Sequence, residues 1–433
     1  MKTKLSPKFW AALTIFSLVG QVAWVIENMY LNVFIYKMFQ ATQDDISTMV
    51  AASAIAATLT TIFIGALSDK IGKRRLFMCG GYILWGISIL GFGLIRTDIL
   101  APIVPATVSV ASVGISLVII LDCLMTFFGS SANDAAFNAW LTDSTDDTNR
   151  GSAEGINAMM PLVAILVVFG GFMLLNMSQD DPQYWSTVFG IIGGVVLVIG
   201  VLGFFIIDDP KIEPSKTSYM HNIVHGFLPS TIKSNVSLYI YLICFIIFNI
   251  SIQIFMPYLM LYYDVSLGLG ENYVLVMAPA VVIASVVTAI WGKVYDKKGF
   301  SFSSAFSIAW LCVGYVMLYL FKNTALVFIG SLFMMSGYLA GMAVFGAKVR
   351  DLTPVGQAGM FQGVRIFSQV LVPGVIGPKI GAWILRDADE VVGGDGTKSF
   401  IPNENIFLGA LIVAIVMIVV MVVCNGITNK KKA

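Results

Sequence analysis

The sequence predicts an all-α membrane protein with twelve transmembrane helices in two parallel-related six-helix halves. Of its 433 residues, 58% are hydrophobic and only 12% are charged, and the mean hydropathy is +0.86. An average soluble domain has about 25% charged residues, so this composition excludes a water-exposed globule. A short charged segment also recurs at corresponding places in the two halves, which predicts a duplicated transporter.

A transmembrane helix needs roughly 20 mainly apolar residues, and the chain offers such stretches at regular intervals. They are centred in residues 9–38, 46–67, 76–95, 109–139, 152–176, 186–207, 236–263, 271–291, 301–321, 325–347, 359–385 and 405–425. The first, fourth, seventh and eleventh are longer than a bilayer requires, which predicts tilt or protrusion. The first stretch has no small-residue cleavage site, so we expect a retained helix and not a signal peptide.

The distribution of basic residues predicts the orientation. An even number of spans places both termini on one side, and nineteen Lys and Arg residues fall there against five on the other side. Because positive charges accumulate in cytoplasmic loops, we expect both termini in the cytoplasm and the protein in the inner (plasma) membrane. A net charge of +1 gives no electrostatic basis for binding nucleic acid.

Two repeats indicate duplication. The sequence GALSDKIGKRR at 65–75 matches GKVYDKKG at 292–299 in the spacing of Gly, Asp and Gly. The sequences at 143–155 and 351–363 share an Asp, a Gly eight residues later and a further Gly. These repeats divide the chain into a six-helix half at 1–207, a cytoplasmic loop at 208–235 and a second half at 236–433. Such parallel halves are expected of one large class of transporters.

The segment GALSDKIGKRR resembles motif A of the major facilitator superfamily, and the resemblance covers essentially the whole chain. Within it, the chain is similar to the sugar–cation symporters of the glycoside–pentoside–hexuronide group and to sucrose–proton symporters. That similarity rests on the opening KLS, on Met29-Tyr30-Leu31, and on Arg150 sixteen residues after Asp134. Sodium-coupled melibiose-type members also use acidic residues in helix 2, whereas residues 46–67 contain none, which argues against a sodium site of that kind.

The resemblance implies a cytoplasmic gate in which the carboxylate of Asp69 contacts the start of helix 11 near residues 359–362. A carboxylate near a helix N-terminus is stabilised by the helix dipole, and this contact would latch the outward-open state. We expect Asp296, in the second copy, to be the lesser partner. The gating candidates are Gly65, Asp69, Gly72, Arg74, Asp143, Arg150 and Asp296; the basic residues among 73–75 also satisfy the positive-inside pattern.

Polar side chains on helix 1 predict a substrate site. Gln21, Trp24, Asn28 and Asn32 fall on one stripe at helical spacing, with Glu27 on its flank. Amides and carboxylates bind sugar hydroxyls, and an indole ring stacks on the apolar face of a sugar. The alternative is that the amides hold neighbouring helices together.

Ionisable residues within spans are costly and therefore candidates for coupling. On helix 4, Asp122, Thr126 and Asn133 share a face with Asp134 beside it, and burial favours the protonated form of a carboxyl group. Arg365 on helix 11 would pair with Asp134 or Glu27 and be released when the carboxylate is protonated; a permanent ion pair is the alternative. Further cavity candidates are Asn249, Gln253 and Gln369, whereas Tyr258, Tyr262 and Tyr263 are interpreted as an interfacial belt.

These features favour a secondary transporter that carries a sugar or glycoside together with a proton or another cation. The alternatives are a proton-coupled exporter of drugs or metabolites and a non-transporting membrane sensor or scaffold. No nucleotide-binding or hydrolase motif is present, so neither an enzyme nor a cofactor is expected. His221 and His225 alone do not predict a metal site. We expect a monomer with the lipid bilayer as its surroundings.

Overall fold

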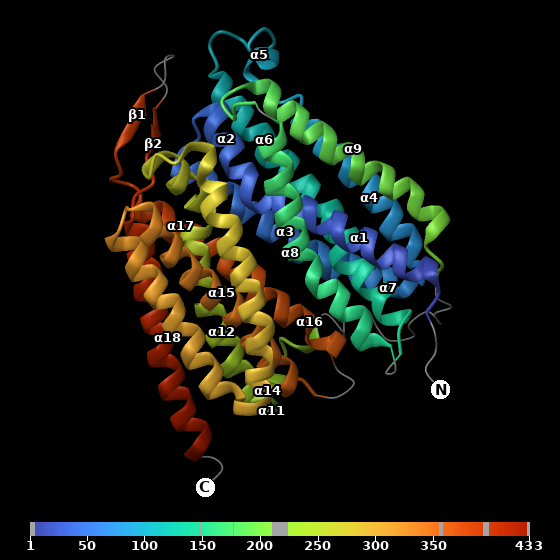
Figure 1. Ribbon diagram of the computed structural model, residues 1–433. Helices are drawn as coiled ribbons and strands as arrows, with labels where there is room; N and C mark the ends of the chain where they lie inside the picture. The colour runs from blue at the N-terminus through green and yellow to red at the C-terminus, as the bar shows by residue number, and fades with distance from the viewer. Residues whose placement is uncertain are drawn as a thin grey trace. The chain divides into compact units, whose positions relative to one another are not determined.

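The computed structural model describes residues 5–146, 149–175, 177–209, 224–354, 358–392 and 398–430. Contacts divide the chain into two compact units (Figure 1). Unit 1 comprises residues 1–41 and 52–219, and unit 2 comprises residues 42–51 and 220–433.

In unit 1 all regular secondary structure over the described residues is helical. Its elements are α1 (Pro7–Val25), η1 (Ile26–Tyr30), α2 (Leu31–Phe39), most of α3 (Gln43–Ile71), α4 (Arg74–Phe92), α5 (Thr97–Leu100), α6 (Val110–Gly129), η2 (Ser130–Phe137), α7 (Asn138–Asp143), α8 (Arg150–Leu174) and α9 (Pro182–Ile206). Segments η1 and η2 are π-helical insertions within longer helices.

Among its described residues, the regular secondary structure of unit 2 is helical apart from one small sheet. Its elements are α11 (Pro229–Ser234), α12 (Val236–Phe255), η3 (Met256–Tyr258), α13 (Leu259–Leu261), η4 (Tyr262–Ser266), η5 (Gly270–Asn272), α14 (Tyr273–Leu320), α15 (Thr324–Leu352), α16 (Ala358–Ile366), η6 (Phe367–Leu371), α17 (Val372–Ile384), β1 (Glu390–Val392), β2 (Lys398–Phe400) and α18 (Asn405–Lys430). Strands β1 and β2 are antiparallel, with Val391 opposite Ser399.

The predicted spans are confirmed as helices. Ten stretches of the described chain are long and apolar enough to cross a membrane. One of them contains α14, in which Gly299 breaks the helix with φ 76° and ψ −177°, so this stretch holds the predicted eighth and ninth spans. The predicted eleventh span corresponds to α16, η6 and α17.

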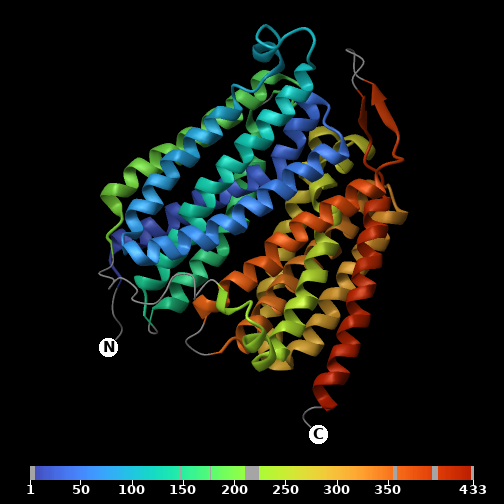
Figure 2. The ribbon, with the colours of Figure 1, turned by 180° about the vertical axis from the view of Figure 1, so that it is seen from behind.

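Small residues let the helices of each unit approach closely. In unit 1, α9 lies along α4 (Figure 1), and a Cβ atom on Gly86 would come within 2.5 Å of the backbone nitrogen of Leu197. In unit 2, Gly337 lies equally close to the α14 backbone at Leu311. Figure 2 shows both units from behind, with α18 packed along α12. This glycine-mediated contact is typical of helices within membranes.

The two copies of the charged repeat share an unusual backbone conformation. Gly72 has φ 70° and Gly299 has φ 76°, and both occupy the third matched position of the repeat. Side chains other than hydrogen make this left-handed region unfavourable. The glycine is therefore required by the turn in both copies.

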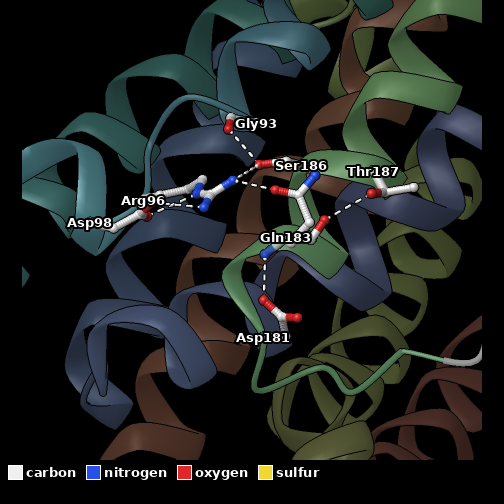
Figure 3. Close-up of polar contacts among 7 residues, drawn as sticks. All are labelled: Gly93, Arg96, Asp98, Asp181, Gln183, Ser186 and Thr187. Carbon is white, nitrogen blue, oxygen red and sulfur yellow. Dashed lines mark hydrogen bonds and ion pairs between the residues drawn. The ribbon is translucent and has the colours of Figure 1, made fainter.

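A polar network ties the start of α5 to the start of α9 (Figure 3). The Arg96 guanidinium donates to both carboxylate oxygens of Asp98, at 2.9 and 2.7 Å, and to Gln183 Oε1 and Ser186 Oγ at 2.9 and 3.1 Å. The Ser186 hydroxyl donates in turn to the Gly93 carbonyl at 2.8 Å. Hydrogen bonding by Arg96 lowers the pKa of Asp98 below its usual value.

The interpretation of three tyrosines as an interfacial belt is wrong. Tyr258, Tyr262 and Tyr263 are each 0% exposed, whereas belt residues would lie on the outer surface. The Tyr258 hydroxyl donates at 3.1 Å to the Pro378 carbonyl, and the Tyr263 hydroxyl lies 2.5 Å from Ser331 Oγ. Tyr258 lies in η3, and Tyr262 and Tyr263 lie in η4; the spacing of the tyrosines alone did not reveal their burial.

Candidate functional site

A buried polar cluster joins three helices of unit 1 at Glu27. The Oε1 atom of Glu27 accepts hydrogen bonds from Ser53 Oγ of α3 at 2.9 Å and from Thr126 Oγ1 of α6 at 2.8 Å. These two hydroxyl oxygens also lie 2.8 Å apart. Glu27 is only 7% exposed, so its carboxyl group is buried.

Asp122 belongs to the same cluster. It lies one helical turn before Thr126 on α6, is 2% exposed, and is close to both Ser53 and Glu27. Glu27 Oε2 and Asp122 Oδ1 are both buried and have no hydrogen-bond partner within the described part of the chain. Two carboxyl groups that the sequence predicted as coupling candidates are therefore brought together.

Several predicted site residues lie in π-helical segments. Glu27 and Asn28 are in η1, Asn133 and Asp134 are in η2, and Gln369 is in η6. A π segment inserts one extra residue into a turn and is frequent at functional sites. Together with η4, these segments fall in the first, fourth, seventh and eleventh spans, which the sequence analysis marked as over-long.

The insertion changes the predicted stripe on helix 1. Gln21 and Trp24 are half-buried and Asn28 is exposed, so these three share an accessible face. Asn32 follows the π segment, is 2% exposed, and has a buried Oδ1 atom with no partner among the described residues. The Asn28 amide donates to the Trp24 carbonyl at 2.8 Å, and the Trp24 ring lies 5.2 Å from that of Trp85.

The predicted residues on η2 separate into a buried and a half-buried position. Asn133 is 5% exposed, and its Oδ1 atom accepts a hydrogen bond of 3.2 Å from the Tyr82 hydroxyl of α4. Tyr82 also donates to the Phe16 carbonyl of α1 at 2.7 Å. Asp134 is half-buried. The Tyr82 hydroxyl thus links Asn133 of η2 to Phe16 of α1, so Asn133 takes part in an interhelical contact.

In unit 2 the predicted polar residues also differ in exposure. Asn249 is 5% exposed and donates to the Phe245 carbonyl one turn earlier at 2.8 Å. Gln253 and Gln369 are half-buried. Arg365 of α16 is half-buried, and its Nε atom is buried without a hydrogen-bond partner among the residues that the structure describes.

The gating candidates of unit 1 are partly brought together. The Arg74 guanidinium is 4% exposed, donates to Asp143 Oδ2 at 2.9 Å and bonds to the Ser68 hydroxyl. Gly65 lies in the last turns of α3, two turns before Gly72. The side chains of Asp69 and Arg150 lie outside the described residues, so the proposed latch of Asp69 stays a prediction.

The second half shows a related contact with different chemistry. Asp351, which matches Asp143 in the repeat, accepts a hydrogen bond of 2.5 Å from the Tyr295 hydroxyl. Tyr295 occupies the position that matches Ser68. Asp296 is exposed. In the second half the carboxylate of Asp351 is therefore contacted by a neutral phenol, whereas in the first half the matching carboxylate of Asp143 is contacted by a guanidinium group.

Sequence reasoning missed Ser53, Tyr82 and Tyr295. Their only signal was position: Ser53 lies in the middle of a span, and Tyr295 precedes the repeated Asp. Thr126 was placed on the face of Asp122, but nothing in the sequence indicated its contact with Glu27. Hydroxyl groups are common in transmembrane helices, so their type alone does not predict a site.

Comparison with known proteins decides the family. The family model described as Major Facilitator Superfamily matches residues 11–378. The chain belongs to the Major Facilitator Superfamily. Autophagy-related protein 22 of Candida albicans is 23% identical to it over 387 residues, which are 84% of this chain and 74% of that protein.

Solved transporters have the same fold. A bacterial homologue of the human lysosomal transporter Spinster, inward-facing and unoccupied, gives a TM-score of 0.69 at 12% identity, over 97% of this chain and 96% of that one. The xylose transporter XylE from E. coli, partially occluded and inward open, gives a TM-score of 0.68 at 13% identity, over 96% of this chain and 99% of that one. The nucleoside transporter NupG gives a TM-score of 0.67 at 11% identity, over 96% of this chain and 98% of that one. At such identities the likeness shows the major facilitator fold alone.

Proposed function

We propose that this transporter carries a sugar or glycoside together with a proton, by alternating access, across the inner (plasma) membrane. Its two halves would be 1–207 and 236–433, joined by a cytoplasmic loop at 208–235, with both termini in the cytoplasm. The observation that carries the proposal is the accessible polar face of α1 and η1 in the middle of a membrane span. The group of sugar–cation symporters remains the proposed relationship within the superfamily.

The polar face of helix 1 supports a water-filled solute path. Asn28 is exposed and Gln21 is half-buried, although both lie in the middle of an apolar stretch of 33 residues. Polar side chains at this depth are tolerated where they line an aqueous cavity. Trp24 on the same face offers a ring on which a sugar can stack. Neutral hydroxylated solutes suit this combination of amides and an indole better than charged solutes do.

Unit 2 offers amides of the same kind. Gln253 of α12 and Gln369 of η6 are half-buried, so their amides are accessible. Asn249 is engaged with a backbone carbonyl and is a weaker candidate. The names of the structural relatives are consistent with this choice, since xylose and nucleosides both carry several hydroxyl groups.

The carboxyl groups of unit 1 would couple uptake to the ion gradient. Glu27 is buried on the flank of the polar face of helix 1, and the half-buried Asp134 lies on η2. We propose that Arg365 pairs with one of them and is released on protonation. An Arg365→Gln variant should then lose uphill uptake or its pH dependence; uptake unchanged in both respects would defeat this part.

A transport assay with purified protein in proteoliposomes tests the function. A panel of mono- and disaccharides and glycosides should include one that wild-type protein takes up faster than empty vesicles. Asn28→Ala should raise the KM for that solute, whereas Asn272→Ala, an exposed amide outside the polar face, should not. Export of amphipathic cations with no sugar uptake would instead support the exporter alternative.

A further inference from the structure

We propose that unit 1 binds one phospholipid, with an acyl chain in an apolar groove between α1, α8 and α9 and an ammonium-bearing headgroup at the ion pair of Lys37 and Asp180. This inference goes beyond the proposed function, because the ligand is a membrane lipid and not the transported solute.

The groove has a volume of about 390 Å³ and lies among three helices of unit 1. Helix α1 packs against both α8 and α9 (Figure 1) and contributes Leu18, Val19 and Val22. The remaining lining residues come from α8 between positions 167 and 175 and from α9 between positions 188 and 196. Ligand pockets commonly have volumes of about 300–1,000 Å³, so the groove is large enough to hold a ligand.

The chemistry of the lining selects a hydrocarbon chain. The lining residues in the described part of the chain are Leu, Val, Ile, Phe and Gly, which offer no polar side chain. A water molecule in a cavity needs two to four polar partners, so water does not suit the groove. Val167, Ile191 and Val195 are 49%, 53% and 46% exposed, so the groove opens to the surroundings of these spans. In a membrane those surroundings are acyl chains, and a chain in the groove gains dispersion contacts with the lining.

An ion pair beyond one end of the groove selects the headgroup. Lys37 Nζ of α2 lies 3.2 Å from Asp180 Oδ1 in the connection between α8 and α9, and their side chains are 16% and 72% exposed. Phe172 lines the groove and contacts the rings of Tyr30 and Tyr184 at 4.5 and 6.1 Å, which places this end of the groove beside η1 and the start of α9. A phospholipid with an ammonium group carries the complementary charges. Its phosphate would accept from the Lys37 ammonium, and its own ammonium would donate to the exposed Asp180 carboxylate.

The separation between the charges and the inner end of the groove fits one leaflet. Asp181, next to Asp180, is the N-cap of α9, and Val196 is the last groove residue on that helix. At a rise of 1.5 Å per residue they are roughly 22 Å apart. Half the thickness of a bilayer with its headgroups is about 20–22 Å. A single phospholipid spans this distance with its charges at one end, whereas a second copy of the chain would not require both features.

The lipid site is separate from the polar face proposed for the solute. At about 3.6 residues per turn, Gln21 lies roughly 160° around α1 from Val19. Gln21, Trp24 and Asn28 form the accessible polar face, and none of them lines the groove. Lipid binding can therefore be measured independently of solute transport.

Lipid-dependent stability of the full-length protein in detergent tests the site. After co-purified lipid is removed, the unfolding temperature would be followed by tryptophan fluorescence with added phosphatidylethanolamine, phosphatidylcholine or phosphatidylglycerol. Wild-type protein should show a saturable rise of several degrees with phosphatidylethanolamine and a smaller rise with the other two lipids. Asp180→Asn should remove the preference for phosphatidylethanolamine over phosphatidylcholine, because the carboxylate that accepts from the ammonium is lost.

Two adjacent glycines of α8 supply a matched pair of variants. Gly171 lines the groove and Gly170 does not, and a Cβ atom at either position would have no neighbouring atom within 4 Å. Gly171→Phe should fill the groove and raise the phosphatidylethanolamine concentration for half the effect at least tenfold, whereas Gly170→Phe should leave it unchanged. Equal responses of wild-type protein to the three lipids, or equal responses of the two variants, would overturn the site. A wild-type dimer that Gly171→Phe converts to a monomer would also overturn it, because a second copy would then occupy the groove.

Discussion

Breaking the Arg74–Asp143 pair from the carboxylate side should destabilise the protein strongly. Arg74 is 4% exposed, whereas the side chain of Asp143 is 25% exposed. Asp143→Asn removes the negative charge and leaves the buried guanidinium with neutral acceptors, the Ser68 hydroxyl among them. Removing one partner of a fully buried pair costs about 3–5 kcal/mol. The partial exposure of Asp143 and the remaining hydrogen bonds reduce this, and we expect about 2 kcal/mol.

Replacing Arg74 should reduce stability less than replacing Asp143. Arg74→Gln leaves a carboxylate that is already partly solvated, and we expect a loss of about 1 kcal/mol because water replaces part of the lost interaction. The double variant should therefore be less damaged than the sum of the two, with a coupling energy of about 1 kcal/mol or more. Asp296→Asn changes an exposed carboxylate in the second copy of the charged repeat and should stay within about 0.5 kcal/mol of wild type.

Thermal unfolding in detergent, followed by tryptophan fluorescence, would measure these effects. At about 2–4 °C per kcal/mol for domains of roughly 150–250 residues, Asp143→Asn should lower the unfolding temperature by about 4–8 °C. An effect of Asp143→Asn no larger than that of Asp296→Asn would refute the reasoning. So would strict additivity of the two single variants, because it would show that the ion pair contributes nothing.

Three further outcomes are expected from the structure. Gly86→Ala should destabilise unit 1 by about 1–3 kcal/mol because its methyl group meets the α9 backbone. Gly194→Ala, with open space around it, should leave stability unchanged. The unfolding temperatures of the two variants measure this difference. Tyr295→Phe should lose the hydrogen bond to its carboxylate partner and lower the stability by about 1 kcal/mol. An unchanged stability would contradict this contact. Arg96 lowers the pKa of Asp98 in the folded state. Wild-type protein should therefore lose stability relative to Asp98→Asn as pH falls below about 4, by at most about 0.5 kcal/mol because the pair is exposed. Equal dependence of stability on pH in the two proteins would contradict this.

The spans and the duplication were predictable because membrane insertion imposes long apolar stretches and charged loops on the sequence. The two copies of the repeat at 65–75 and 292–299 also share a local conformation, since Gly72 and Gly299 both have positive φ angles. These features depend on local composition and spacing. They can therefore be recognised without knowledge of tertiary contacts.

The geometry of the candidate site was not predictable in the same way. Regular helical spacing predicts that Asn28 and Asn32 lie on one face. A π-helical insertion adds one residue to the turn and rotates the residues that follow it, so Asn28 is exposed whereas Asn32 is buried. The contact between Glu27 and Ser53 joins residues 26 positions apart on different helices. The packing of α3 against η1 brings these two groups together, and the hydropathy pattern of the sequence does not predict this contact.

Solute accumulation by wild-type protein in proteoliposomes tests the central claim most directly. Vesicles with an imposed inward proton or sodium gradient would be compared with the same vesicles after an ionophore has collapsed that gradient. We predict that a sugar or glycoside accumulates above its external concentration under one of the two gradients and only equilibrates once the gradient is collapsed. Equal accumulation with and without either gradient would contradict cation-coupled transport.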